Sequence, residues 1–208
     1  NDPFIVLDDA DVDLAVAMAI KSRMANSGQV CFSSKRFFVQ ETVLNDFLTK
    51  LESKVKNLKV GNPMEGDTNL GPLARDDLTE KYVDQLDRTV KQGDTIVYGN
   101  FPAEGNTIKP SIVLVQDFEK SVMTKEEVFG PTFSVIPFKA DEEAIEMANK
   151  TNYGLGATII SKDLDLAEGY SRLIDSGLCF INDSVTSHHH LPCGGVKESG
   201  FGDRKSVV

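Results

Sequence analysis

Residues 26–40 read NSGQVCFSSKRFFVQ, and they join a predicted helix to a predicted strand. Upstream, apolar residues recur at helical spacing, and Gly28 is expected to stop that helix. Downstream, the apolar run at 36–40 predicts a strand. Cys31 lies at the junction, where a side chain can face a cleft, whereas a structural cysteine is expected inside an apolar run. The stretch therefore indicates the order helix, cysteine turn, strand.

Strands and helices alternate in both directions from this stretch. The expected strands are short and almost wholly apolar, as is typical of strands buried on both faces of a parallel sheet. The alternation predicts an α/β fold of three layers, in which helices cover both faces of a mostly parallel sheet. The first helix is expected to have Asp9 or Asp11 as its N-cap. The expected strands are 4–7, 36–40, 95–98, 112–115, 132–138, 156–161 and 177–182, and the expected helices are 11–28, 42–58, 76–92, 141–150 and 164–173.

The overall composition excludes several classes of protein. The 208 residues, 40% of them hydrophobic, suffice for one large domain or two small ones. The formal net charge of -10, with no run rich in lysine and arginine, argues against a nucleic-acid-binding surface. No apolar run approaches the roughly 20 residues that span a membrane, and the first residues carry no signal-peptide pattern. The 3 cysteines are too widely spaced for a disulfide framework or a zinc site, so a reducing cytoplasm is the expected location.

The first residues suggest how much of the protein is present. Asn1-Asp2-Pro3 leads directly into the apolar run at 4–7, which predicts a buried strand. A buried strand is an unusual N-terminus, so we expect the chain to be part of a longer polypeptide. The chain contains no GxxxxGKS/T loop, no GxGxxG at the start of a βαβ unit and no GxSxG elbow. A dinucleotide-binding half is therefore expected to lie outside it.

Cys31 is the first candidate for chemistry. A cysteine attacks as the thiolate, and nearby cations favour that form; Lys35 and Arg36 follow it in the sequence. The alternative is a buried cysteine that acts only as a small hydrophobic residue. The spacing alone leaves both interpretations open.

Two further segments carry polar groups close to turn signals. At 124–133 the sequence TKEEVFGPTF places two glutamates and a phenylalanine before a predicted strand, where one acid and one aromatic ring could meet a ligand. The alternative is an ordinary loop with solvated glutamates. At 187–202 the glycine-rich sequence SHHHLPCGGVKESGFG suggests a loop at the mouth of a pocket, with a solvated surface as the alternative. No metal site is expected there, because adjacent histidines point in different directions and lack further ligands at suitable spacing.

Three motifs in this order resemble the catalytic domain of the NAD(P)-dependent aldehyde dehydrogenases. They are NSGQVC at 26–31, EEVFGPTFSVIPF at 126–138 and CGGVKESGFG at 193–202. The opening NDPFIVLDDADVDLA also resembles the segment that follows the family's Glu-Leu-Gly-Gly motif. The resemblance covers essentially the whole chain. It implies that residues 1–208 are an aldehyde dehydrogenase catalytic domain without the N-terminal cofactor-binding domain, and that the parent protein is a homo-oligomer.

The resemblance also implies roles for individual residues. Cys31 matches the catalytic nucleophile, which attacks the aldehyde carbonyl, and its backbone N–H matches half of the oxyanion hole. Glu127 matches the glutamate that binds the ribose hydroxyls of the nicotinamide half of NAD or NADP, and Phe129 matches the ring beside the nicotinamide. The loop from Ser187 to Cys193, with His188 and His189, matches the lining of the entrance for the small aldehyde substrate; these three, Ser187, His188 and His189, are the expected substrate-binding residues.

The chain departs from the family pattern at several points. The general-base glutamate, the oxyanion-hole asparagine and the glycine-rich cofactor domain of the family are absent from it, so the chain alone is expected to bind cofactor poorly and not to turn over. The segment DRKSVV after Gly202 lacks the usual continuation into the oligomerisation strand, and Cys193 stands where phenylalanine is common.

A narrower resemblance concerns the substrate. The segments GQVC followed by KRF, then NLGPLAR and GGVKESGFG, are similar to those of bacterial succinate-semialdehyde dehydrogenases. These enzymes need a cation for the distal carboxylate; Ala25 stands where some relatives have arginine, and His188, His189 or His190 could partly supply that charge. Two other interpretations stay open: an acylating relative, in which coenzyme A takes the thioester, and a non-catalytic oligomerisation or binding module.

Overall fold

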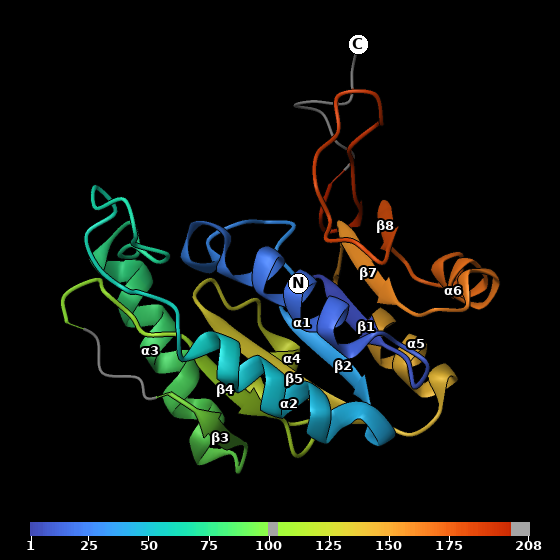
Figure 1. The fold of residues 1–208 in the computed structure, drawn as a ribbon, viewed down its shortest axis with the longest axis horizontal. Coiled ribbons are helices and arrows are strands. Elements are labelled where there is room, and N and C mark those ends of the chain that lie inside the picture. Colours follow the sequence, from blue (N-terminus) through green and yellow to red (C-terminus); the bar gives the residue numbers. More distant parts are fainter. Residues whose placement is uncertain (100–103, 201–208) are drawn as a thin grey trace.

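The computed structural model describes residues 1–99 and 104–200, and within them the chain forms a seven-stranded sheet with helices on both faces (Figure 1). The sheet has the order β3-β4-β5-β2-β1-β7-β8. The strands are β1 (Pro3–Val6), β2 (Arg36–Gln40), β3 (Thr95–Tyr98), β4 (Ser111–Leu114), β5 (Thr132–Phe138), β7 (Gly156–Ile160) and β8 (Leu178–Ile181). The helices are α1 (Val12–Met24), α2 (Glu41–Val55), α3 (Asp76–Lys91), α4 (Val122–Lys125), α5 (Asp141–Asn149) and α6 (Leu164–Ser171). Two short strands, β6 (Tyr153–Gly154) and β9 (Val196–Lys197), pair with each other.

The sheet is parallel except at one edge, where β3 pairs with β4 in antiparallel fashion. The register aligns Ile5 of β1 with Phe38 of β2, and Phe38 with Ile136 of β5. Because these central strands run in the same direction, the segments that precede them meet at the same edge of the sheet. The predicted class, an α/β fold with a mostly parallel sheet, is confirmed. None of the helices in the described ranges is long and apolar enough to cross a membrane.

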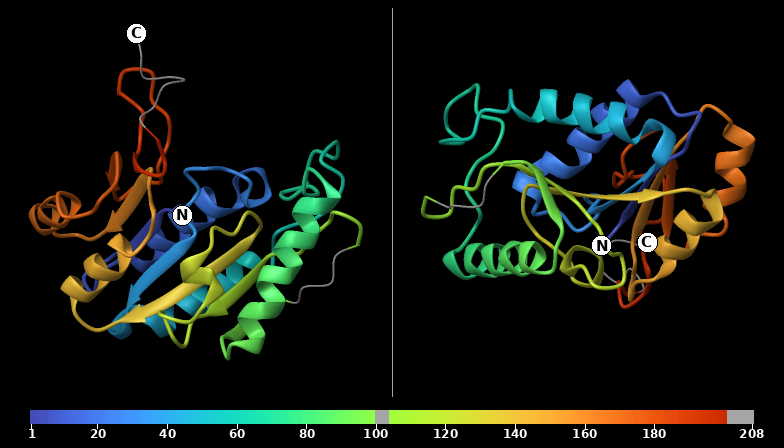
Figure 2. Two further views of the ribbon diagram at one scale, coloured as in Figure 1. Left: turned by 180° about the vertical axis from the view of Figure 1, so that it is seen from behind. Right: turned by 90° about the horizontal axis from the view of Figure 1, so that it is seen from below.

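The three layers follow from the alternation of side chains along each strand. Phe4 and Val6 of β1 point into a core beneath α1 and α2, whereas Ile5 between them points into a second core beneath α3, α4 and α5. In the first core, Phe37 of β2 packs between Phe4 and Phe133, with ring centroids 5.3 and 5.2 Å apart. Figure 2 shows the two helical layers on opposite sides of the sheet.

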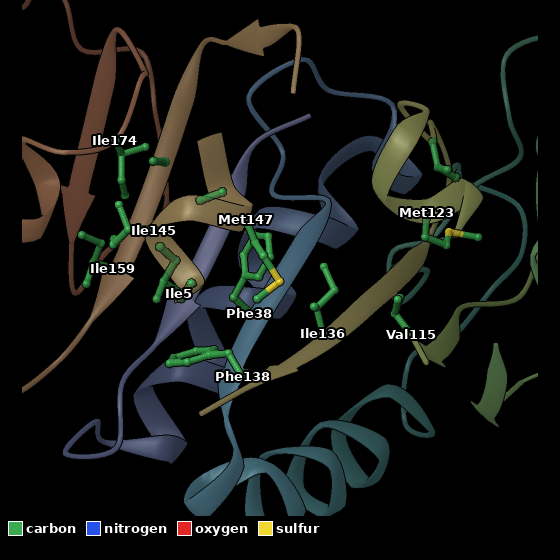
Figure 3. Close-up of a cluster of buried hydrophobic side chains, with 14 of the residues drawn as sticks. Ile5, Phe38, Val115, Met123, Ile136, Phe138, Ile145, Met147, Ile159 and Ile174 are labelled. Atoms are coloured by element: carbon green, nitrogen blue, oxygen red, sulfur yellow. The ribbon is translucent and has the colours of Figure 1, made fainter. Parts of the chain in front are cut away.

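The second core is drawn in Figure 3. Ile5, Phe38 and Ile136 lie on neighbouring strands, and Ile145 and Met147 of α5 cover them. All five side chains are buried, and the most exposed of them, Met147, has an accessible fraction of 8%. This packing holds the strands that precede and follow the candidate site in a fixed register.

The start of α1 agrees with one of the two predicted caps. The Asp11 carboxylate accepts hydrogen bonds from the backbone N–H of Asp13 and of Leu14, at 3.0 and 3.1 Å, which satisfies two of the helix's free donors. Asp9 has a different task, because it accepts a hydrogen bond from the hydroxyl of Ser161 after β7. Asp11 is therefore the N-cap.

The end of α1 differs from the prediction. The helix ends at Met24 and not at Gly28, and a short 3₁₀ segment, η1 (Ala25–Gly28), follows it. Asn26 and Ser27 have φ angles of 48° and 57° in the left-handed region, and Gly28 has 78°. Consecutive left-handed residues turn the chain sharply, at a cost that the surrounding contacts must offset.

Candidate active site at the amino edge of the sheet

The predicted nucleophile, Cys31, is exposed in a turn between η1 and β2. Two side chains tether the chain just before it. The Ser27 hydroxyl donates to the Gly71 carbonyl at 2.8 Å, and the Gln29 side-chain oxygen accepts from the Ala74 backbone N–H at 2.9 Å. The loop that carries Cys31 is therefore anchored to the segment that leads into α3.

Two glycines let the Cys31 loop approach the loop that carries the glutamates. A Cβ atom at Gly28 would lie 2.3 Å from the carbonyl oxygen of Gly130, and a Cβ atom at Gly130 would lie 2.2 Å from the ring of Tyr82 on α3. Both distances are far below ordinary van der Waals contact. The motifs NSGQVC and EEVFGP can therefore approach closely, because each has a glycine at the point of contact. The ring of Tyr82 packs against Gly130.

Lys35 lies behind the Cys31 turn, with an accessible fraction of 2%. Its ammonium donates hydrogen bonds to the carbonyl oxygens of Val30, Cys31 and Ser33, at 3.1, 2.9 and 2.8 Å. Burial, followed by the charge of Arg23, lowers the pKa of Lys35, against the opposing influence of nearby carboxylates. A single cation therefore gathers the carbonyl groups of the turn on one side.

The same ammonium joins this turn to the glutamate loop. Lys35 Nζ lies 3.1 Å from Glu127 Oε1 and 5.0 Å from the ring centroid of Phe129. Burial raises the pKa of the Glu127 carboxyl, and the charge of Lys35 acts in the opposite direction and lowers it. The carbonyl of Cys31, the carboxylate of Glu127 and the ring of Phe129 thus all lie close to one ammonium group.

Glu127 and Phe129 line a cavity of about 280 Å³. Lys81 and Gln85 of α3 line it as well, and the Gln85 amide donates to the Glu127 carbonyl oxygen at 3.3 Å. Lys81 and Gln85 were not singled out from the sequence. They recur with Leu78 at helical spacing on one face of α3, so two polar residues in that row were the available signal.

Arg23 of α1 is fully buried beneath both loops. Its guanidinium donates to the carbonyl oxygens of Thr132 and Val128, each at 2.7 Å, and to the Ser33 hydroxyl at 3.4 Å. Burial lowers its pKa to about 10, so the side chain stays charged at neutral pH. Sequence patterning suggested only that its stem continues the apolar face of α1, whereas the charged head group organises the site.

A second arginine holds the glutamate loop from outside. Arg88 of α3 contacts both carboxylate oxygens of Glu126, at 2.7 and 2.9 Å, and Gln85 donates to one of them at 3.0 Å. The Arg88 guanidinium lowers the pKa of Glu126 to about 2. Glu126 therefore binds Arg88 of α3, whereas its neighbour Glu127 binds Lys35 and lines the cavity.

Backbone donors in the Cys31 turn remain available. Across residues 1–99 and 104–200, the N–H groups of Val30, Cys31 and Phe32 have no protein acceptor. Donors left free beside an exposed thiol are what an oxyanion formed by attack of that thiol needs.

The predicted entrance residues lie apart from this centre. Ser187, His188 and His189 are exposed on the segment between β8 and β9, which projects from the body of the molecule (Figure 1). We call residues 183–195 the arm. The imidazole rings of His188 and His189 stack with centroids 4.9 Å apart. No hydrogen bond or ion pair within the described part of the chain joins these residues to Cys31, and their role in substrate binding stays a prediction. Residues 201 and 202 of the third motif lie outside the described residues.

The described residues contain no group of three or more histidine, cysteine or acidic side chains that could hold a metal ion. What they do contain is an exposed thiol, free N–H donors, an ionised carboxylate and an aromatic ring beside a cavity. This set can attack a carbonyl carbon, stabilise the resulting oxyanion and bind a polar ligand through Glu127.

Comparison with known proteins identifies relatives of this chain. The model of the aldehyde dehydrogenase family matches residues 1–208. Aminoaldehyde dehydrogenase 2 of Solanum lycopersicum is 39% identical over 205 residues, which are 96% of this chain and 40% of that protein. The succinate semialdehyde dehydrogenase Sad of Escherichia coli strain K12, whose name includes NAD(P)+, is 37% identical over 97% of this chain and 44% of its own length.

A solved structure gives the same picture in three dimensions. The crystal structure of succinic semialdehyde dehydrogenase from Streptococcus pyogenes in complex with NADP+ superposes with a TM-score of 0.92 at 38% identity. The match covers 96% of this chain and 44% of that one. The chain therefore spans about two-fifths of the length of these relatives.

Proposed function

Since this chain belongs to the aldehyde dehydrogenase family, we propose that it is the catalytic portion of an NAD(P)-dependent enzyme that oxidises an aldehyde to a carboxylic acid. Residues 1–208 then form one domain of a longer enzyme, whose cofactor-binding domain lies outside them. The carrying observation is the convergence of the Cys31 turn, Glu127 and Phe129 on the Lys35 ammonium.

The cofactor fits the residues present. Glu127 has one oxygen held by Lys35, and its other oxygen remains to accept a ribose hydroxyl, while Phe129 offers a flat apolar surface for a ring. The adjoining cavity of about 280 Å³ is lined by Lys81 and Gln85, which can donate to oxygen atoms. When bound, NAD(P)+ supplies the hydride acceptor.

The chain's own residues account for the first covalent step. The Cys31 thiolate attacks the aldehyde carbonyl carbon, the C=O π bond opens, and its electron pair moves to oxygen to give a thiohemiacetal oxyanion. The backbone N–H of Cys31 donates to that oxyanion. After hydride loss the product is a thioester on Cys31, and water releases the acid. A base for that water is expected from the part of the enzyme that precedes residue 1.

Succinate semialdehyde is the substrate that we propose first. Relatives from Escherichia coli and Mycobacterium avium with this name are each 37% identical to the chain. Aminoaldehyde and glutarate-semialdehyde enzymes match at 39% and 37%, so identity alone does not separate the candidates. His188, His189 and His190 are exposed on the arm, and each imidazole ring can donate a hydrogen bond to a carboxylate.

The test is reduction of NAD or NADP by the intact enzyme, followed by absorbance. Succinate semialdehyde, an aminoaldehyde and uncharged alkyl aldehydes are offered separately, with and without coenzyme A. We expect oxidation that Cys31→Ser lowers by about a thousandfold or more, while Cys179→Ala on β8, the matched control, keeps most of it. Turnover only with coenzyme A would replace the hydrolytic reaction by the acylating one. A preference for uncharged aldehydes would reject the proposed substrate, and no turnover at all would favour a binding module.

A homo-oligomer is proposed for the intact enzyme on the basis of the family resemblance. Sedimentation equilibrium measures its mass directly, and a mass equal to one chain would refute the proposal.

A further inference from the structure

Lys35 has a set of partners that an ordinary structural lysine does not have. Its ammonium is buried, and within the described residues all of its hydrogen-bond and ion-pair partners belong to the Cys31 turn or to Glu127. A buried ammonium is costly unless it is paired and hydrogen-bonded. Here the stabilising partners come from two separate loops, so the cation depends on both and holds both in place.

The contacts with the turn also orient its donors. The carbonyl oxygens of Val30, Cys31 and Ser33 all point towards Lys35 Nζ, at 2.8–3.1 Å. In a planar peptide unit the N–H points away from the adjoining C=O. The carbonyl of Val30 belongs to the same peptide unit as the N–H of Cys31, so fixing the carbonyl aims the N–H away from Lys35.

The contact with Glu127 holds the second loop, which carries Glu127 and Phe129, against Lys35. Lys35 Nζ binds Oε1 of Glu127 at 3.1 Å, which leaves Oε2 as the oxygen that can meet a ligand. Phe129 lies over the same ammonium at a centroid distance of 5.0 Å, within the range of a cation–π contact. A shift of Glu127 or Phe129 on ligand binding therefore changes the contacts of the Lys35 ammonium.

We propose that Lys35 is a positioning residue that couples the cofactor-binding carboxylate of Glu127 to the oxyanion-hole N–H of Cys31. Cofactor bound at Glu127 thereby sets the geometry of the nucleophile turn before aldehyde arrives. This inference rests on the proposed function. It goes beyond it in assigning to one lysine, which touches neither the aldehyde nor the cofactor, the link between the two halves of the site.

The experiment is a double-mutant cycle in the intact enzyme. Lys35→Met removes the charge and keeps the length of the side chain, and Glu127→Gln removes the ion pair from the other side. Lys120→Met is the matched control, because Lys120 is exposed and pairs with Asp117 at the surface. Two readouts do not depend on turnover: equilibrium binding of NADPH or NADH by fluorescence, and the alkylation rate of Cys31 by iodoacetamide with and without cofactor.

We expect each single variant to weaken cofactor binding by about tenfold. The double variant should bind cofactor no more than about threefold more weakly than the single variant with the lower affinity, because both substitutions remove the same link. Cofactor should change the alkylation rate of Cys31 in the wild type and in Lys120→Met but not in Lys35→Met. Independent, multiplying losses in the cycle would overturn the proposal, and so would an unchanged cofactor effect in Lys35→Met.

If Lys35→Met does not fold, Glu127→Gln alone decides. Glu127 reaches the Cys31 turn through Lys35, so an alkylation rate within about twofold of the wild-type rate would overturn the coupling. Failure of the proposed function is seen separately: a wild type that binds cofactor and shows the alkylation effect, but oxidises no aldehyde, would reject the reaction and keep the coupling.

Discussion

Replacement of Gly28 by alanine should test the close approach of the two loops at the site. The new Cβ would lie 2.3 Å from the Gly130 carbonyl oxygen, about 1 Å closer than ordinary contact permits. Relief of such a clash in a packed region costs about 1–3 kcal/mol. The φ angle of 78° adds about 1–2 kcal/mol for a residue with a side chain. The free energy of unfolding should therefore fall by about 2–5 kcal/mol, and Tm by about 4–20 °C for a chain of this size.

Two other glycines separate the contributions in the same thermal-unfolding experiment followed by circular dichroism. Gly66 has an ordinary φ angle and no atom within 4 Å of the place that an added methyl group would occupy, so Gly66→Ala should change Tm by no more than a few degrees. Gly93 has a φ angle of 103° and the same open space, so Gly93→Ala should show the backbone cost alone. A Gly28→Ala protein that melts no lower than Gly93→Ala would refute the idea that the loops are in tight contact.

Three more predictions concern individual side chains. At pH 8 iodoacetamide should label exposed Cys31 in the folded protein while Cys179, whose pKa burial raises to about 12, reacts only after unfolding; mass spectrometry of digests would show early label on Cys179 if this is wrong. Arg23→Met should lower the free energy of unfolding by at least about 2 kcal/mol in urea titrations, because two buried carbonyl groups lose their donor, and a loss below about 0.5 kcal/mol, on the order of a neutral surface change, would contradict it. Arg88→Gln should destabilise the protein at pH 7, and the difference from wild type should shrink as the pH falls from the ordinary Glu126 pKa of 4.5 towards about 2, since protonation removes the ion pair; a difference constant over that range would exclude Glu126 as the cause.

Much of the fold follows from local patterns that the sequence displays. Phe37 and Phe38 occupy adjacent positions of an apolar run, and each finds a core because helices cover both faces of β2. Asp11 precedes the first helical turn and caps it. These features depend on spacing within a few residues, so a strand or a helix could be predicted without knowledge of the rest of the chain.

Other features depend on contacts between distant segments and could not be predicted. The left-handed conformations of Asn26 and Ser27 need the anchors at residues 71–74. The pairing of β6 with β9 involves two residues from each strand and is invisible to any periodicity. The short helix α4 was likewise not expected.

The location of the site also depends both on local patterns and on contacts between distant segments. Ligands in open α/β sheets usually bind beyond the carboxyl ends of the strands. Here the Cys31 turn precedes β2 and the glutamate loop precedes β5, so both lie at the amino edge. They are neighbours because β2 lies beside β5 in the sheet, although about 90 residues separate them in the chain. The motifs could be found from the sequence, but their adjacency required the strand order.

The arm is attached to the fold in a way that bears on how this protein can change over evolutionary time. At its base the backbone of Gly177 passes so close to that of Gly194 that a Cβ atom would lie 1.8 Å from the Gly194 oxygen, and β6 pairs with β9 immediately beyond. The base is therefore intolerant of mutation, whereas Ser187–His190 at the tip belong to neither of the two cores described above. Mutations can therefore accumulate at residues 187–190 with little loss of stability, and the sequence of the arm can change without a new fold having to evolve.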